Sequence, residues 1–268
     1  MKLKLLIFSS LCFVFPITYA ATVGTDNASA TPYATWDNLD DGFITGAPAF
    51  GAWTLTGAAS GGGTAGRFIG DSTTLAPTNT GGNINSAGPS AFGLFAHRNN
   101  TVGATALSQA FRNFDSNLSV GQVFSISLAV NFRNGDKGID LRDSTDTTLF
   151  NLNIGSNGYN VNNTTFGNGP VGAAAYDSNT VFNISLTQTS LSGGSWSIVR
   201  SGGISESDSG NFTGVVNRLR VYNASTDNGS NENNLFVNNL SIVPEPSTFG
   251  LLALSTLGAM ALLRRRRS

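Results

Sequence analysis

The ten residues from Val123 to Phe132, VFSISLAVNF, decide the fold class of this chain. The residues between the large ones are small or polar, and every second residue is large and apolar: Phe124, Ile126, Leu128, Val130 and Phe132. Because successive side chains of a β-strand point to opposite faces, this period of two puts all the large side chains on one face. The run therefore predicts a strand with one face in a core and the other toward solvent.

The same alternation recurs on both sides of this run. It is clearest at 180–187, with Phe182, Ile184 and Leu186, and it returns at 218–222. Gly193-Gly194 then predicts a hairpin between 180–190 and the following strand. Shorter candidate strands are 52–56, 67–70, 91–97, 107–112, 138–142, 148–154, 195–200 and 234–243. We expect the stretches 58–66 and 75–88, which are rich in Gly, Ser, Thr and Asn, to be surface loops.

Composition argues against a helical fold. The 268 residues include 32 Gly and only 12% charged residues, and Asn, Ser and Thr are abundant, all of them poor helix formers. About eleven to thirteen short strands with one apolar face each must fold over into two packed sheets or close into a barrel. We predict an all-β fold, an antiparallel β-sandwich that resembles the jelly-roll, concanavalin-like architecture and spans residues 21–243.

Residues 1–20 have the pattern of a secretory signal peptide. Lys2 and Lys4 precede an apolar stretch, and Pro16, Thr18 and Ala20 provide the break and the small residues of a cleavage site. The single cysteine, Cys12, lies within this segment, so the mature chain is expected to contain no disulfide.

The C-terminal segment has the pattern of a membrane anchor. Residues 247–263 carry no charge over 17 positions, which span about 25 Å as a helix, the lower limit for crossing a bilayer. Positively charged residues stay on the cytoplasmic side of a membrane, so the body before this span is expected outside the cytoplasm. The residues that set this topology are Arg264, Arg265, Arg266 and Arg267.

The segment Val243 to Ser268 resembles the PEP-CTERM sorting signal of Gram-negative bacteria. Pro244, Glu245 and Pro246 precede the apolar span and the terminal arginines, in the order of that signal. The resemblance implies that an exosortase, a membrane-embedded transpeptidase-like enzyme, recognises these three residues and that the protein reaches the cell surface or an extracellular polymer matrix. We therefore expect three segments: a signal peptide at 1–20, the β-sandwich body at 21–243 and the sorting signal at 244–268.

Few residues are suited to catalysis. His97 is the only histidine, and we expect it to have a structural or surface role, so a nucleophilic triad and a zinc site are both disfavoured. Glutamates of the mature chain are limited to Glu206, Glu232 and Glu245, without the closely spaced acidic pattern of concanavalin-like glycosidases. The sequence therefore predicts a protein that is not an enzyme.

A weak calcium candidate lies in the run NGDKGIDLRDSTDTT. Its oxygen ligands would be Asp140, Asp143 and Asp146, but their spacing matches no calcium loop, and Lys137 and Arg142 offer ion pairs instead. No other cofactor is expected. Trp53 and Trp196 alternate with Thr or Ser and are expected in the core; these two and Trp36 could stack on sugar rings only if they were exposed.

Charge excludes one class of partner. Between residues 21 and 243 there are nine basic and 15 acidic residues, a net charge of −6, which would repel nucleic-acid phosphates. We expect a structural, non-catalytic protein of the cell surface or extracellular matrix, with an exosortase and the membrane as partners. The alternative is a glycan-binding module that attaches extracellular polysaccharide to the surface, and the third hypothesis is a glycosidase-like enzyme.

Overall fold

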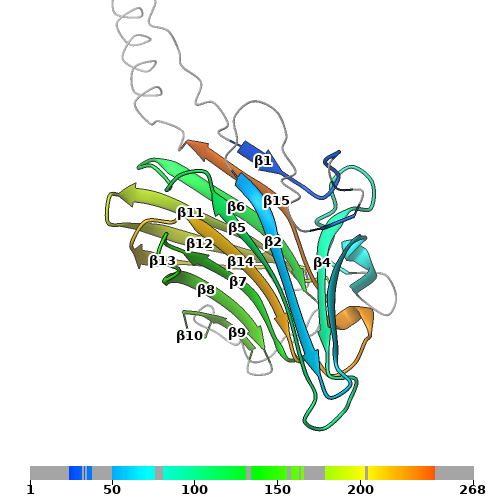
Figure 1. The fold of residues 1–268 in the computed structure, drawn as a ribbon. Coiled ribbons are helices and arrows are strands. Elements are labelled where there is room, and N and C mark those ends of the chain that lie inside the picture. Colours follow the sequence, from blue (N-terminus) through cyan, green and yellow to red (C-terminus); the bar gives the residue numbers. More distant parts are fainter. Residues whose placement is uncertain are drawn as a thin grey trace, which may run out of the picture. The chain divides into compact units, whose positions relative to one another are not determined.

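The described residues form a β-sandwich. The computed structural model describes residues 24–31, 33, 35–37, 50–75, 81–130, 134–155, 158–162, 164–165, 179–202 and 205–244, which all belong to one compact unit, Thr22–Glu245. Their named strands all pair antiparallel, in one sheet of eight strands and one of seven (Figure 1). The described part contains no α-helix, only the 3-10 turns η1 (Ser72–Leu75) and η2 (Asn231–Asn233). The predicted all-β antiparallel fold is confirmed.

The first sheet, sheet A, is built around the strand that the sequence made clearest, β6. In spatial order it contains β13 (Glu206–Thr213), β12 (Gly193–Ser201), β11 (Val181–Ser190), β6 (Gln122–Val130), β15 (Leu235–Pro244), β4 (Ala91–His97) and β3 (Thr64–Gly70). The short β1 (Gly24–Asp26) pairs with β15.

The second sheet, sheet B, packs its apolar face on that of sheet A. Its order is β10 (Thr164–Thr165), β9 (Gly158–Val161), β8 (Thr148–Gly155), β7 (Asp136–Arg142), β14 (Arg218–Ala224), β5 (Thr105–Phe114) and β2 (Phe50–Ser60). One hydrophobic cluster joins residues of both sheets.

The alternating residues lie in this core. All six side chains that the alternation placed inside are buried, with at most 1% of their surface exposed: Phe124, Ile126, Leu128, Phe182, Ile184 and Leu186. Phe132 of the same run lies outside the described residues. The prediction of which face is buried is therefore confirmed for β6 and β11.

Truncating one of these side chains should be costly. We expect Ile126→Ala to lower the free energy of unfolding by about 2 to 5 kcal/mol, because the buried side chain leaves a cavity between close-packed sheets. Ser125→Ala, a neighbouring change on the outer face of the same strand, should change it by less than about 0.5 kcal/mol. Denaturant unfolding of both variants measures the difference, and equal effects would contradict the assignment of faces.

One local prediction was wrong, and the predicted hairpin, formed by β11 and β12, is confirmed with an earlier turn. The stretch 58–66 is mostly strand: β2 runs to Ser60, β3 starts at Thr64, and Gly61 and Gly62 make the turn with positive φ angles of 61° and 90°. In the predicted hairpin the turn residues are Leu191 and Ser192, and the two glycines already belong to β12. Small residues at the exposed ends of strands show no alternation of apolar and polar side chains, so a sequence pattern predicts them as loop.

Four strands were missed. β13 has polar or small residues at almost every position, and β1, β9 and β10 are only two to four residues long. A hydrophobic period cannot be read from such segments. Residues 81–88 form a loop as predicted, whereas 76–80 lie outside the described residues.

Candidate functional site

Three aromatic rings and an imidazole form a row on the outer face of sheet A. Phe68 of β3 and Phe95 of β4 alternate with glycines on the partner strand, so that Phe95 covers Gly66 and Phe68 covers Gly93. A Cβ added at either glycine would lie 2.5 or 2.6 Å from the covering ring, which explains why glycine occupies these positions.

The rings of this row contact one another. The Phe95 ring stacks on the His97 imidazole at 5.0 Å between centroids and 18° between planes, and the Phe68 ring lies 6.3 Å from that of Phe95. Phe236 of β15 meets Phe68 edge to face at 5.3 Å. We call Phe68, Phe95 and His97 the ring row; Phe68 and Phe95 are half-buried, His97 is buried at 9% exposure, and Phe236 is fully buried.

A cavity of about 260 Å³ lies against the ring row. Besides the row itself, Gly229, Asn231 and Asn234 from the loop before β15 line it. A second cavity, of about 520 Å³, shares Phe68 and Phe95 and includes Trp36, Asp37 and Arg67 among its lining residues. The two rings thus border both hollows.

His97 is neutral at pH 7 in this setting. Burial, and next the positive charge of Lys137, hold the pKa of its imidazole below the usual value. Nδ1 is buried without a hydrogen-bond partner in the described part of the chain, and Nε2 faces Gly229, where an added Cβ would lie 3.5 Å from it. A neutral imidazole can both donate and accept a hydrogen bond.

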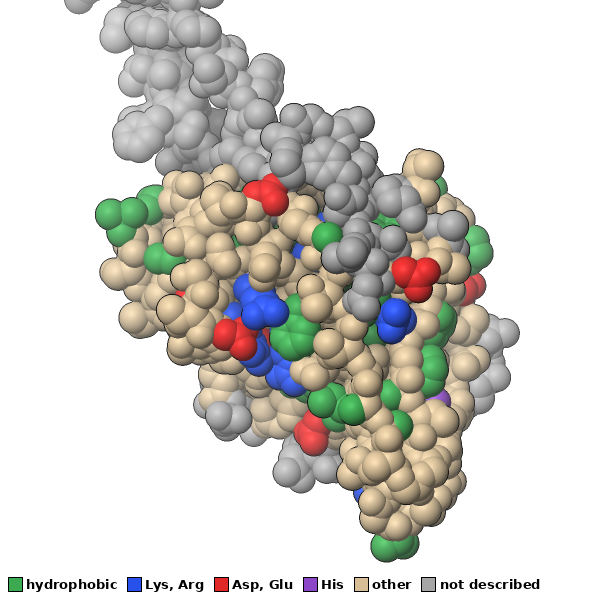
Figure 2. Space-filling view, in the orientation of Figure 1, with side chains coloured by type: hydrophobic (Ala, Val, Ile, Leu, Met, Phe, Trp, Pro, Cys, Tyr) green, Lys and Arg blue, Asp and Glu red, His purple; other side chains and the backbone are tan. Residues whose placement is uncertain are grey.

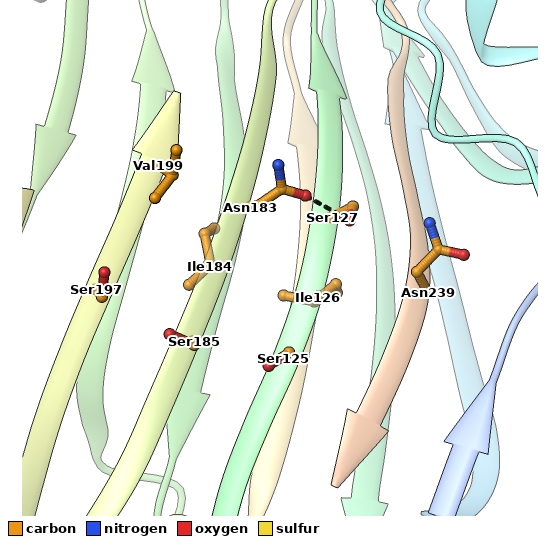
Figure 3. Close-up of a pocket in the computed structure, with 9 residues that line it drawn as sticks. All are labelled: Ser125, Ile126, Ser127, Asn183, Ile184, Ser185, Ser197, Val199 and Asn239. Atoms are coloured by element: carbon orange, nitrogen blue, oxygen red, sulfur yellow. Dashed lines mark hydrogen bonds between the residues drawn. The ribbon is translucent and has the colours of Figure 1, made fainter. Parts of the chain in front are cut away.

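A different surface covers the other end of sheet A. There a shallow groove of about 180 Å³ is lined by serines and asparagines of β6, β11, β12 and β15 (Figure 3). Ser127 donates a hydrogen bond to Asn183 at 2.8 Å. The strand register aligns hydroxyls across six strands, at Ser209, Ser197, Ser185, Ser125, Ser241 and Thr25. No aromatic ring lines this groove, so it offers hydrogen bonds without a stacking surface.

The calcium candidates lie among arginines. Asp140 accepts hydrogen bonds from Arg142 at 2.6 Å and from Arg220 at 2.8 Å, and Asp146 accepts from Arg142 and Arg218 at 2.9 Å each. Most of the face in Figure 2 is uncharged, and the charged side chains that it shows include a mixed basic and acidic patch.

Asp143 has a different role. Its carboxylate accepts hydrogen bonds from the Thr145 hydroxyl and from the backbone N–H groups of Thr147 and Thr145, which hold its pKa below the usual value and close the β7–β8 turn. The three carboxylates therefore bind arginines or their own turn. No cluster of three or more His, Cys, Asp or Glu that could hold a metal occurs among the described residues.

Lys137 does not join this acidic run. Its side chain is fully buried, and Nζ donates to the backbone oxygen of Asn233 at 2.9 Å. Side chains of a β-strand alternate between its two faces, so Lys137 points inward with Ile139 and Leu141. Asp136 and Asp140 of the same strand point to the opposite face. The expectation that Lys137 offers an ion pair to the run was wrong for this reason.

The residues weighed for catalysis and stacking are dispersed. Glu206 lies on β13 and Glu232 in η2, near β4; five strand spacings, roughly 24 Å, separate β13 from β4. Glycosidase carboxylates stand about 5 to 10 Å apart. All three tryptophans are buried, as expected for two of them: Trp36, Trp53 and Trp196.

The last strand leads directly into the sorting motif. β15 lies inside sheet A and ends at Pro244, which pairs with Gln122, and β1 runs beside it with Gly24 opposite Ile242. The other residues of the sequence prediction lie outside the described part: 1–20, Glu245, Pro246, 247–263 and 264–267. Within the described part, no helix is long and apolar enough to cross a membrane.

Residues 243–267 match the family described as the PEP-CTERM protein-sorting motif. The chain carries a PEP-CTERM sorting signal. The signal marks it as an exported protein that an exosortase sorts. No curated protein matches this PEP-CTERM protein in sequence.

Several solved structures are similar to parts of the body of the PEP-CTERM protein at low TM-scores. The body is similar to the catalytic domain of β-agarase D from Zobellia galactanivorans, at 7% identity, covering 72% of this chain and 76% of that one, with a TM-score of 0.35. The Emp47p carbohydrate recognition domain is 10% identical, with 79% of this chain and 95% of that chain covered and a TM-score of 0.32. A glycosyl hydrolase family 16 protein from Mycobacterium smegmatis is 12% identical, with 84% of this chain and 99% of that chain covered and a TM-score of 0.28.

The sequence prediction missed most residues of the ring row and its cavity. His97 was noticed only as the lone histidine, and Phe68, Phe95, Asn231 and Asn234 were not singled out. The signal that could have found the two phenylalanines is the alternation of glycine and phenylalanine in both GRFIG and AFGLFAH, because a large ring next to a glycine position on a paired strand marks an aromatic surface.

Proposed function

We propose that the mature protein is a structural, non-catalytic component of the cell surface or extracellular matrix, displayed there by an exosortase. The observation that carries this proposal is the PEP-CTERM motif at 243–267, placed immediately after the last strand of the body. The described body reaches Pro244, so the exosortase would act within a few residues of a folded sheet.

The composition of the C-terminal segment supports a division of labour. The apolar span at 247–263 would hold the chain in the bilayer, and the four arginines after it would fix its direction. Pro244 and Pro246 disfavour helix and keep the backbone extended, which is the form in which proteases bind their substrates.

The five described carboxylates weighed for catalysis or calcium support a body without catalysis. Asp140 and Asp146 are engaged by arginines, Asp143 closes a turn, and Glu206 and Glu232 lie on distant elements. A pair of free carboxylates across a cleft, which glycoside hydrolysis needs, does not occur among these five residues.

Glu245→Ala should block processing without preventing insertion in a host that contains an exosortase. The change removes the only charge of the motif and leaves the span and the arginines intact. We expect the membrane-bound precursor to accumulate and the form without the C-terminal helix to fall at least tenfold, measured by immunoblotting and intact-mass spectrometry.

Ser247→Ala, one residue beyond the motif, is the matched control and should be processed like the wild type. An unprocessed C-terminus through Ser268 in wild-type surface protein, despite an active exosortase, would contradict the proposal. The segment would then be a tail anchor.

Polysaccharide binding is the second candidate function. The ring row favours it, because half-buried rings that border a cavity beside amide side chains offer both the stacking surface and the hydrogen bonds that sugars use. Pull-down of the protein with insoluble polysaccharides tests this function, and it is compatible with a structural role in a matrix.

A further inference from the structure

We propose that the cavity between the ring row and the loop Gly229–Asn234 binds a neutral pyranose unit of a polysaccharide. This inference rests on the second candidate function, polysaccharide binding. Phe95 and Phe68 supply the apolar wall of the cavity, and His97, Asn231 and Asn234 supply its polar groups.

The apolar wall suits one face of a sugar ring. A pyranose has C–H groups on its faces and hydroxyls at its edge, so it stacks on a flat ring while its hydroxyls form hydrogen bonds at the side. Phe95 lies beside His97 on the same strand, with 18° between the two ring planes, and its underside is fixed over Gly66. The stacking surface is therefore rigid before any ligand arrives, which reduces the entropy cost of binding.

Two polar atoms beside this wall have no partner. Within the described residues, His97 Nδ1 and Asn234 Oδ1 are buried without a hydrogen bond, and Asn231 lines the same cavity. Asn231 is exposed and Asn234 is buried at the base of the loop. Amide and imidazole groups can donate to and accept from hydroxyls, as an uncharged polyol requires.

The cavity carries no charge that would select an acidic sugar. None of its lining residues is Asp, Glu, Lys or Arg, and His97 is neutral at pH 7. The charged groups of an anionic polymer would lose their hydration in the cavity without gaining an opposite charge there, which costs free energy. A neutral sugar loses only hydrogen bonds to water that the three side chains replace.

The volumes fit a polymer better than a free sugar. The cavity of about 260 Å³ has room for one ring, and the cavity of about 520 Å³ lies across Phe68 and Phe95. A chain that crosses these two rings would place successive units in the two cavities.

The test is a titration of the full chain, in a zwitterionic detergent that has no sugar headgroup, with hexasaccharides. Cello-, laminari-, malto-, xylo- and agaro-oligosaccharides are the neutral probes, and oligoguluronate is the anionic probe. We expect at least one neutral probe to bind. Phe95→Ala and Gly229→Val, which remove the stacking ring and fill the cavity, should weaken it about tenfold or more.

Two variants and a folding measurement make the result decisive. Phe95→Tyr keeps the ring and should bind like the wild type, and Val199→Ala, on the serine-lined groove, is the matched surface control. Circular dichroism and melting temperature identify any variant that fails to fold, in which case Asn231→Ala, at an exposed position, replaces it.

The outcomes separate the site from the function. Binding by the wild type that the cavity variants leave unchanged would overturn the site and keep polysaccharide binding. Binding of oligoguluronate alone would overturn the neutral class. If the wild type bound none of the probes and no insoluble polysaccharide, both this inference and the second candidate function would be wrong, while sorting by an exosortase would be unaffected.

Discussion

Asp26→Asn is expected to lower the free energy of unfolding of the body by about 3 to 5 kcal/mol, because it removes the negative charge of a buried salt bridge with the Arg112 guanidinium. The side chains of Asp26 and Arg112 are each only 1% exposed and form a salt bridge between β1 and β5.

Neighbouring side chains hold this pair in one geometry. The Tyr33 hydroxyl donates to Asp26 at 2.8 Å, Trp53 Nε1 donates to Tyr33 at 2.9 Å, and Arg112 Nε donates to the backbone oxygen of Gly51 at 2.8 Å. The guanidinium also lies 4.9 Å from the centre of the Trp53 ring. An amide at position 26 could still accept a hydrogen bond but could not balance the charge.

The exposed pair Arg67 and Asp37 provides the comparison. Its atoms are 3.8 Å apart, and the Asp37 side chain is 65% exposed. Asp37→Asn should therefore change the free energy of unfolding by less than about 1 kcal/mol. Denaturant unfolding at pH 7.5 measures both variants, and a loss below about 1 kcal/mol for Asp26→Asn would show that the buried pair contributes little.

This pair also shows which parts of the structure a single sequence can predict. The alternation in VFSISLAVNF and TVFNISLT identified β6, β11 and their buried faces, because a period of two is a local property of the chain. Asp26 and Arg112 are 86 positions apart and carry no local pattern that joins them. They meet because β1 of sheet A lies against β5 of sheet B when the two sheets pack together.

The sorting signal could likewise be predicted from the sequence, whereas the ring row and its cavity could not. The sorting signal is a contiguous motif, so its composition and order could be recognised without any structure. The ring row needs the register of β3 against β4, and its cavity needs a loop that is more than 130 positions away from His97. Asn231 and Asn234 read only as turn residues in the sequence, because nothing local shows that they face two phenylalanines.

Lys137 is a buried charge that destabilises the fold. Its side chain is 0% exposed, and burial lowers the pKa of its amine from 10.5 to about 7, although the charge of Asp227 opposes the shift. Between pH 7 and about 10.5 the unfolded chain binds a proton here that the folded chain does not. The free energy of unfolding therefore rises with pH across this window. Below pH 7 the amine is protonated in both states, so Lys137 causes no further change of stability with pH there. At about 1.4 kcal/mol per pKa unit, the cost of this shift at pH 7 is on the order of 4 kcal/mol.

Lys137→Met should therefore stabilise the body at pH 7 by roughly 1 to 3 kcal/mol. The gain is smaller than the full cost because the hydrogen bond from Nζ to Asn233 at 2.9 Å is lost and its acceptor is left to Asn223, which donates to the same oxygen at 3.1 Å. The variant should also lose the rise in stability between pH 7 and 10, whereas Lys137→Arg, which cannot release its proton, should destabilise the fold. Urea unfolding at pH 7, 8.5 and 10 measures all three chains. A methionine variant that is less stable than the wild type and keeps the same dependence on pH would show that the ammonium is paired well enough to favour folding.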